Sequence, residues 1–184
     1  MLSRISQFIL SLLGWKVVIE AIPTPKKFVL IAVPHTSSWD FPLGLLVRSV
    51  MRMDIKYVGK DSLFRGLFGV IFKWLGGIPV DRSKRNNFVD AVVDMFEDRE
   101  EFKICIAPEG TRKPVSQLKT GFYHIAKGAN IPILLCKFDY EHRTVTVSEP
   151  FYPTDNMEAD FDYIYNYFRG VKGKIPENSF LYKG

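Results

Sequence analysis

Two short polar clusters contain the residues whose types and spacing could carry acid–base chemistry. His35 and Asp40 lie five positions apart in the segment VPHTSSWDF, and Glu109 and Arg112 lie in the segment PEGTR. A histidine oriented by a carboxylate can take a proton from a hydroxyl group, and an arginine can hold a phosphate through two parallel hydrogen bonds. Together the clusters predict proton transfer beside an anion-binding site.

Each cluster directly follows an apolar run that is typical of a buried strand. Residues 28–33 precede His35, and residues 102–107 precede the PEGTR segment. Open α/β folds hold their active sites at the carboxyl ends of the strands. We therefore predict that both clusters share one site at one end of a sheet. The alternatives, for each cluster alone, are a structural histidine and a Glu109–Arg112 pair that acts only as a brace.

The rest of the chain alternates between strand-like and helical patterns. Further strands are predicted at about residues 55–58, 78–80, 131–138 and 143–147, the last as an antiparallel edge strand formed by a hairpin. Helices are predicted at about residues 42–53, 86–98, 115–127 and 155–170, the last with a capping box of Asp155 and Glu158. This order predicts a single-domain α/β fold with a mixed, mostly parallel sheet flanked by helices.

Length and composition limit the possible functions. A chain of 184 residues with 47% hydrophobic residues is long enough to bury a core as one domain. The net charge of +5 suits a nucleic acid, an anionic membrane or a phosphorylated substrate equally well. Cys105 and Cys136 lie inside strand-like runs without a Cys or His neighbour at metal-ligand spacing, so we expect two buried free thiols and no metal site.

Residues 1–20 are predicted to form an amphipathic helix that precedes a domain of residues 21–184. Its apolar stripe consists of Leu2, Ile5, Phe8, Ile9, Leu12 and Leu13. This helix either lies in a membrane interface or packs on the core of the domain; a signal peptide is disfavoured because polar residues interrupt the apolar run. A second candidate for interfacial insertion or for core packing is the aromatic-rich segment 62–75, which carries Arg65 and Lys73.

Four sequence blocks carry a resemblance to a known family. They are HTSSWD at 35–40, GGIPVDR at 76–82, PEGTR at 108–112 and IPI at 131–133. In order and approximate spacing they resemble the glycerolipid acyltransferases, which comprise the 1-acylglycerol-3-phosphate acyltransferases and their lysophospholipid relatives. The resemblance implies that His35 is the general base and that Asp40 orients it. It implies a substrate-binding role for Ser37, Arg82, Glu109, Gly110, Thr111, Arg112 and Pro132, with the two arginines on the acceptor phosphate and Pro132 on the acyl-chain side.

The resemblance also implies the reaction and the setting. We expect transfer of a fatty acyl group from acyl-CoA or acyl carrier protein to the hydroxyl of a lysophospholipid, with no other cofactor. No covalent acyl-enzyme is expected, because no G-x-S-x-G turn surrounds Ser37. The expected place is the cytoplasmic face of a membrane with anionic lipid, as a peripheral protein. Nucleic acid is excluded as a partner, because the aromatics cluster with Leu and Ile rather than alternating with Arg and Lys. The alternatives are a hydrolase on the same fold and a non-catalytic lipid-binding module.

Overall fold

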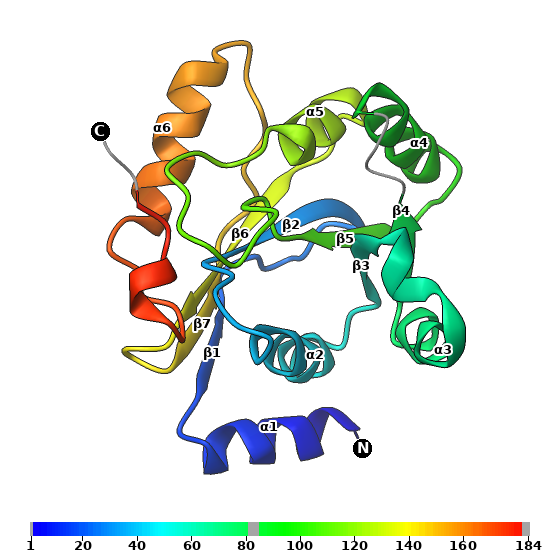
Figure 1. Ribbon diagram of the computed structural model, residues 1–184. Coiled ribbons are helices and arrows are strands. Elements are labelled where there is room, and N and C mark those ends of the chain that lie inside the picture. Colours follow the sequence, from blue (N-terminus) through cyan, green and yellow to red (C-terminus); the bar gives the residue numbers. More distant parts are fainter. Residues whose placement is uncertain (1, 81–84, 182–184) are drawn as a thin grey trace.

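The computed structural model describes residues 2–80 and 85–181, which form a seven-stranded sheet with helices on both faces (Figure 1). The strands are β1 (Lys16–Ile19), β2 (Lys27–Val33), β3 (Ile55–Lys60), β4 (Gly77–Val80), β5 (Phe102–Ile106), β6 (Ile133–Asp139) and β7 (Thr144–Val147). The helices are α1 (Leu2–Leu12), α2 (Asp40–Met51), α3 (Gly66–Trp74), α4 (Arg85–Glu97), α5 (Gly121–Gly128) and α6 (Met157–Phe168), with short 3-10 turns η1 (Asp61–Phe64) and η2 (Pro176–Asn178). The predicted α/β class is confirmed.

The sheet is mostly parallel, and this brings the carboxyl ends of strands that are distant in sequence to the same end of the sheet. Its strand order is β1-β7-β6-β2-β5-β3-β4, and the antiparallel pair is β6 with β7. The central strand β2 pairs in parallel with β6 on one side and with β5 on the other. The loops that leave the carboxyl ends of β2, β5 and β6 therefore lie next to one another, as expected for the two polar clusters.

Both faces of the central strand are buried, which is why its sequence is a continuous apolar run. Val29, Ile31 and Val33 belong to the core beneath α4, α5 and α6. Phe28 and Leu30 belong to the core on the opposite face, which α2 covers and to which α1 contributes Leu10. Figure 1 shows α4, α5 and α6 above the sheet and α2 below it, with α1 lying beyond α2.

Helix α5 begins at Gly121, so the prediction that it begins near Val115 is wrong. Val115, Leu118 and Phe122 have helical spacing, but residues 107–120 form an irregular loop that carries the buried side chain of Leu118 into the core. The loop closes on itself because the backbone N–H of Lys119 donates to the carbonyl oxygen of Pro108 at 2.9 Å. Burial of Leu118 in the core from this loop takes the place of the helix that the spacing predicts.

Three further predictions are corrected. Strand β7 pairs with β6 as an antiparallel hairpin, but β1 pairs with its other side, so β7 is not an edge strand. The helix predicted within residues 1–20 ends at Leu12, and residues 16–19 of that segment form β1. The N-cap of α6 is Asn156, whose side chain accepts a hydrogen bond from the N–H of Ala159; a capping box of Asp155 and Glu158 is not formed.

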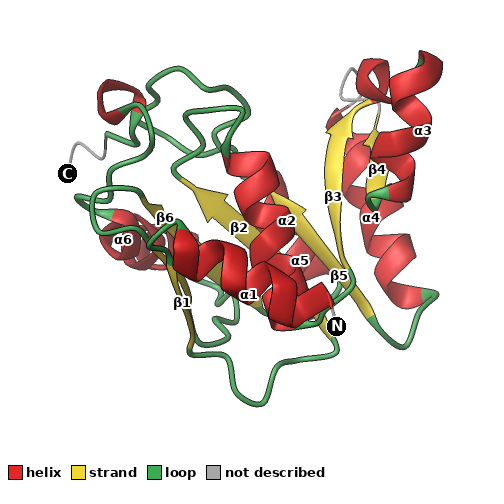
Figure 2. Ribbon diagram, turned by 90° about the horizontal axis from the view of Figure 1, so that it is seen from below, coloured by secondary structure: helices red, strands yellow, loops and turns green. Residues whose placement is uncertain are grey.

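Helices α1 and α3 both expose large apolar side chains. On α1 these are Leu2, Ile5, Phe8 and Leu12, and on α3 they are Val70, Ile71 and Trp74. Figure 2, which views the molecule from the side that α1 covers, shows α1 in front and α3 beside the far end of the sheet. None of the described helices is long and apolar enough to cross a membrane.

Candidate active site

His35 and Asp40 form a hydrogen-bonded pair in the turn that joins β2 to α2. Their Nδ1 and Oδ2 atoms lie 3.0 Å apart. The same carboxylate oxygen accepts the backbone N–H groups of Thr36 and Ser37, each at 2.9 Å. Asp40 is the first residue of α2, where the positive end of the helix dipole also favours a negative charge. The turn therefore holds the carboxylate firmly while the His35 side chain stays 27% exposed.

The environment keeps Asp40 ionised and thereby assigns the His35 tautomer. Burial alone would raise the Asp40 pKa, but hydrogen bonds from His35, from the backbone of Ser37 and from a tyrosine hydroxyl outweigh it, so the pKa lies below its usual value. An ionised carboxylate can only accept hydrogen bonds, so His35 Nδ1 carries the proton. In the neutral imidazole, Nε2 then has the lone pair and can act as a base.

The tyrosine is Tyr140, a residue that sequence reasoning missed. Its hydroxyl donates to Asp40 Oδ1 at 2.7 Å across 100 positions of sequence. Tyr140 is the first residue after β6, and His35 is the second residue after β2. A polar side chain at the carboxyl end of a third buried strand is the signal that could have found it.

Glu109 holds the other end of the histidine loop. Its Oε2 accepts the backbone N–H of His35 at 2.6 Å, although the two residues are 74 positions apart. The side chain is buried, and burial raises the pKa of this carboxyl to about 7, against the opposing effect of the hydrogen bond from His35. Glu109 thus fixes the backbone of the base. No ion pair joins it to Arg112 in the part of the chain that the structure describes.

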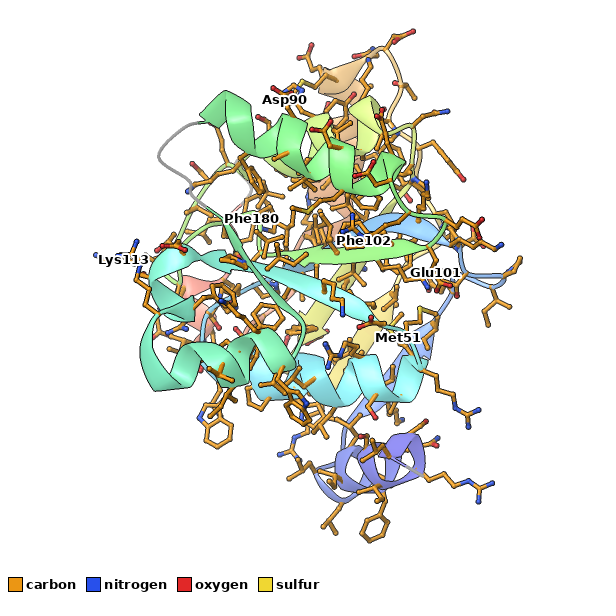
Figure 3. The ribbon with its side chains drawn as sticks, turned by 90° about the vertical axis from the view of Figure 1, so that its right-hand side faces the viewer. Met51, Asp90, Glu101, Phe102, Lys113 and Phe180 are labelled. Atoms are coloured by element: carbon orange, nitrogen blue, oxygen red, sulfur yellow. The ribbon has the colours of Figure 1, made fainter. Side chains whose placement is uncertain are left out.

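The loop after Glu109 presents positive charge to solvent. Gly110 has a φ of +66°, a conformation that side chains rarely adopt, and a Cβ there would lie 2.5 Å from Lys119 Nζ. The turn therefore lays the Lys119 side chain across Gly110. Arg112 and Lys113 follow as exposed residues, and Figure 3 shows Lys113 pointing away from the body of the molecule. Thr111 is also exposed, and its hydroxyl accepts the backbone N–H of Lys113 at 3.2 Å.

The remaining predicted site residues differ in where they lie. Arg82 lies outside the described residues. Ser37 is in the histidine loop, where its hydroxyl accepts the backbone N–H of Trp39 at 3.3 Å. Pro132 is not brought to this site: its carbonyl accepts the N–H of Val29 at 3.1 Å, which places it at the amino end of the parallel pair β2–β6. His35 follows the carboxyl end of β2, about 20 Å away along the strand.

The segment 171–181 joins the two polar loops from outside. The backbone N–H of Ile175 donates to Thr36 Oγ1 at 3.2 Å, beside the histidine. The backbone N–H of Leu181 donates to the carbonyl oxygen of Val115 at 3.1 Å, in the loop that begins after β5. Lys174 lies over the ring of Trp39, with its Nζ 5.0 Å from the ring centre. This segment therefore ties both halves of the site to each other.

A cavity of about 210 Å³ has His35 and Asp40 in its lining. The remainder of the lining is mostly apolar and comes from α2, between Phe41 and Met51, and from β2, β3, β5 and β6. Phe41 and Met51 are about 15 Å apart along the helix axis. Arg48 lines the cavity too, but its Nη1 donates to two backbone carbonyl oxygens at 3.2 and 2.6 Å. Figure 3 shows Met51 and Lys113 toward opposite ends of the strands, so the cavity extends along the strands away from the site.

Fold and site define a class of protein: an α/β domain with a histidine–aspartate pair at the carboxyl ends of its strands, next to an apolar cavity. Its polar residues form no cluster that could hold a metal ion within residues 2–80 and 85–181. The chain belongs to the acyltransferase family, because the sequence model of that family matches residues 16–137, more than half of the chain. The prediction of a glycerolipid-type acyltransferase from four sequence blocks is thereby confirmed at the level of the family.

Comparison with other proteins extends the finding for the fold. No curated protein matches the sequence significantly. Among solved structures, the chain is similar to the 1-acyl-sn-glycerophosphate (LPA) acyltransferase PlsC from Thermotoga maritima. The TM-score is 0.63 at 20% sequence identity, and the match covers 90% of this chain and 74% of the other. At this identity the likeness shows that the two proteins share a fold.

Proposed function

We propose that the protein transfers a fatty acyl group from an acyl thioester to the free hydroxyl of a lysophospholipid such as 1-acylglycerol-3-phosphate. The observation that carries the proposal is the His35–Asp40 pair, with Nδ1 and Oδ2 3.0 Å apart, in the lining of a mostly apolar cavity. The family supplies the reaction class. The similar protein from Thermotoga maritima is a 1-acyl-sn-glycerophosphate acyltransferase, which supports this choice of acceptor.

The geometry supports one order of events. His35 Nε2 removes the proton of the acceptor hydroxyl while Asp40 stabilises the imidazolium that forms. The hydroxyl oxygen attacks the thioester carbonyl and gives a tetrahedral intermediate. The carbon–sulfur bond then breaks, and the imidazolium returns the proton to the departing thiolate. The cavity along α2 receives the acyl chain, since its lining between Phe41 and Met51 is largely apolar.

The acceptor phosphate is assigned to the loop after β5. Arg112 is exposed there and is free of ion pairs with any described residue, and Lys119 is held close by across Gly110. Both residues follow Glu109 in the same loop, and the Glu109 carboxylate accepts the backbone N–H of His35, so this hydrogen bond joins the proposed phosphate-binding loop to the histidine loop. A guanidinium group matches a phosphate in geometry as well as in charge.

The setting we propose is the surface of an anionic membrane, on its cytoplasmic face, with the protein bound peripherally. The exposed apolar side chains of α1 and α3 are suited to the boundary between head groups and acyl chains. The net charge of +5 is attracted to anionic lipid. Lyso-lipids and acyl chains partition into bilayers, so an enzyme that uses them gains from residence there.

The test is His35→Gln, compared with His142→Gln. His142 also forms a His–Asp pair, with Asp139 at 2.7 Å, but it is exposed in the β6–β7 turn. Purified proteins are given vesicles that contain lysophosphatidic acid, with either acyl-CoA or acyl carrier protein as donor. We expect no acylated product from His35→Gln, and full activity from His142→Gln with at least one donor. Undiminished transfer by His35→Gln would refute the proposal. Thioester consumption without acylated lipid would instead identify a hydrolase.

A further inference from the structure

We infer that Tyr140 is a positioning residue, whose hydroxyl fixes the rotation of the Asp40 carboxylate so that Oδ2 faces His35. The kinetic part of this inference rests on the proposed acyltransferase function; the geometric part does not. Tyr140 lies beyond the four sequence blocks that led to the other site residues.

The two oxygens of Asp40 have unequal sets of partners. Oδ2 receives three: His35 Nδ1 at 3.0 Å and the backbone N–H groups of Thr36 and Ser37 at 2.9 Å each. Within the described part of the chain, Oδ1 receives one, the Tyr140 hydroxyl at 2.7 Å. Three of the four partners come from the turn that contains the aspartate, and the fourth comes from the residue that follows β6, the strand next to β2.

This difference matters because a carboxylate turns easily about its last carbon–carbon bond. Contacts through Oδ2 alone anchor one corner of the group and leave its plane free to tilt. The Tyr140 hydroxyl anchors the second corner, and the plane of the carboxylate is then determined. Asp40 is 3% exposed, so water has little access to replace this hydrogen bond. The lone pair that meets His35 Nδ1 is therefore aimed by Tyr140.

Tyr140 is itself held from two other parts of the chain. Its backbone N–H donates to the carbonyl oxygen of Lys172 at 2.9 Å. Its ring meets the ring of Trp15 edge to face, with centroids 4.8 Å apart and an interplanar angle of 88°. The Trp15 contact involves the ring rather than the hydroxyl, so it survives the replacement of tyrosine by phenylalanine.

The chain offers a matched control for that replacement. Tyr123 on α5 is 1% exposed, and its hydroxyl donates to Oδ2 of the buried Asp160 at 2.8 Å. Tyr140→Phe and Tyr123→Phe each remove one hydroxyl that binds a buried aspartate. Asp160 lies in the first turns of α6, where it accepts hydrogen bonds from the backbone N–H and the hydroxyl of Thr154, away from the histidine. A purely structural effect is therefore expected in both variants, and a positioning effect in Tyr140→Phe alone.

Two measurements distinguish a positioning role of Tyr140 from a purely structural one. The first is steady-state acyl transfer. We expect kcat of Tyr140→Phe to fall about 10-fold, the lower end of the loss that follows removal of a partner that orients a metal-ligating side chain, while Tyr123→Phe keeps the wild-type kcat. The KM values of Tyr140→Phe should stay within about twofold of the wild type, because no substrate contact is removed. The second is the proton NMR resonance of His35 Nδ1–H, assigned by its loss in His35→Gln. It should shift in Tyr140→Phe and stay in place in Tyr123→Phe.

The inference is wrong if Tyr140→Phe leaves both kcat and the Nδ1–H resonance unchanged. It is also wrong if the two phenylalanine variants lose the same share of kcat after correction for their folded fractions. Absence of acyl transfer by the wild-type protein with every donor would overturn the proposed function instead. In that case the resonance still decides whether Tyr140 positions Asp40, because it reports the hydrogen bond and not the reaction.

Discussion

Replacing Glu109 by Gln should change how the stability of the protein depends on pH. The Glu109 carboxyl is 3% exposed, and burial raises its pKa from 4.5 to about 7, although the hydrogen bond from His35 acts in the opposite direction. Glutamine has almost the same shape and offers an amide oxygen that can accept the His35 N–H. The substitution therefore removes the ionisation and keeps the hydrogen bond.

The size of the effect follows from the two pKa values. Because the folded state binds the Glu109 proton more tightly than the unfolded chain, ionisation disfavours folding. The contribution of this proton to stability is complete below pH 4.5 and is lost as pH rises through about 7. Each pKa unit is worth about 1.4 kcal/mol, so the free energy of unfolding of the wild type should fall by about 3 kcal/mol relative to Glu109→Gln across this range.

Urea unfolding followed by tryptophan fluorescence at a series of pH values measures this difference. The stability of Glu109→Gln minus that of the wild type should rise between pH 5 and pH 7 and then level off. Other groups that titrate in the same range are present in both proteins and cancel in the subtraction. Glu177→Gln, an exposed carboxyl, serves as the control. A Glu109→Gln difference that is constant from pH 5 to pH 8 would refute the reasoning, because a buried carboxyl that stays protonated or ionised throughout gives no slope.

Three further outcomes are expected from the proposed function. Arg112→Gln should raise the KM for lysophosphatidic acid about 10-fold through the loss of a charge-assisted hydrogen bond, whereas Lys113→Gln, the adjacent exposed cation, should not; equal effects of the two would point to general electrostatics. In Gly44→Leu the new side chain projects from α2 into the cavity, so kcat/KM should fall at least about 10-fold more for a long-chain donor than for a short-chain donor. An unchanged preference between the two donors would place the acyl chain elsewhere. Trp74→Ala should weaken binding to anionic vesicles about 10-fold in a flotation assay, since Trp74 is 83% exposed on α3. Tyr152→Ala is the control, because Tyr152 is also an exposed aromatic residue. Equal binding of wild type and Trp74→Ala would exclude α3 from the membrane interface.

The core of the site was accessible from sequence because it depends on local pattern. An apolar run predicts a buried strand, and the polar residues after it predict a loop at the edge of the sheet. This reasoning found His35 and Glu109 on separate strands and correctly inferred that they meet. It did not assign the hydrogen bond between them, because the Glu109 carboxylate contacts the backbone of His35, and a backbone atom has no signature in sequence.

The parts that sequence reasoning missed depend on long-range contacts. Tyr140 acquires its role from a hydrogen bond to a residue 100 positions earlier, and aromatic residues after strands are common for other reasons. The apolar spacing of Val115 and Leu118 fits a helix, but the tertiary structure uses both residues in an irregular loop that lies over the core. Strand β1 is four residues long, and its pairing with β7 is fixed by the sheet rather than by its own periodicity.

The position of β1 has a consequence for solubility. A sheet edge that is left open offers unpaired N–H and carbonyl groups to other chains, and it can nucleate aggregation. β1 covers the outer side of β7 and is itself the edge strand, only four residues long, and at the opposite edge β4 carries Pro79, which has no N–H to donate. Removal of the first 20 residues would thus uncover β7 as well as delete α1. Precipitation of a truncated protein would therefore report the loss of β1 from the sheet, and it would say nothing about the membrane.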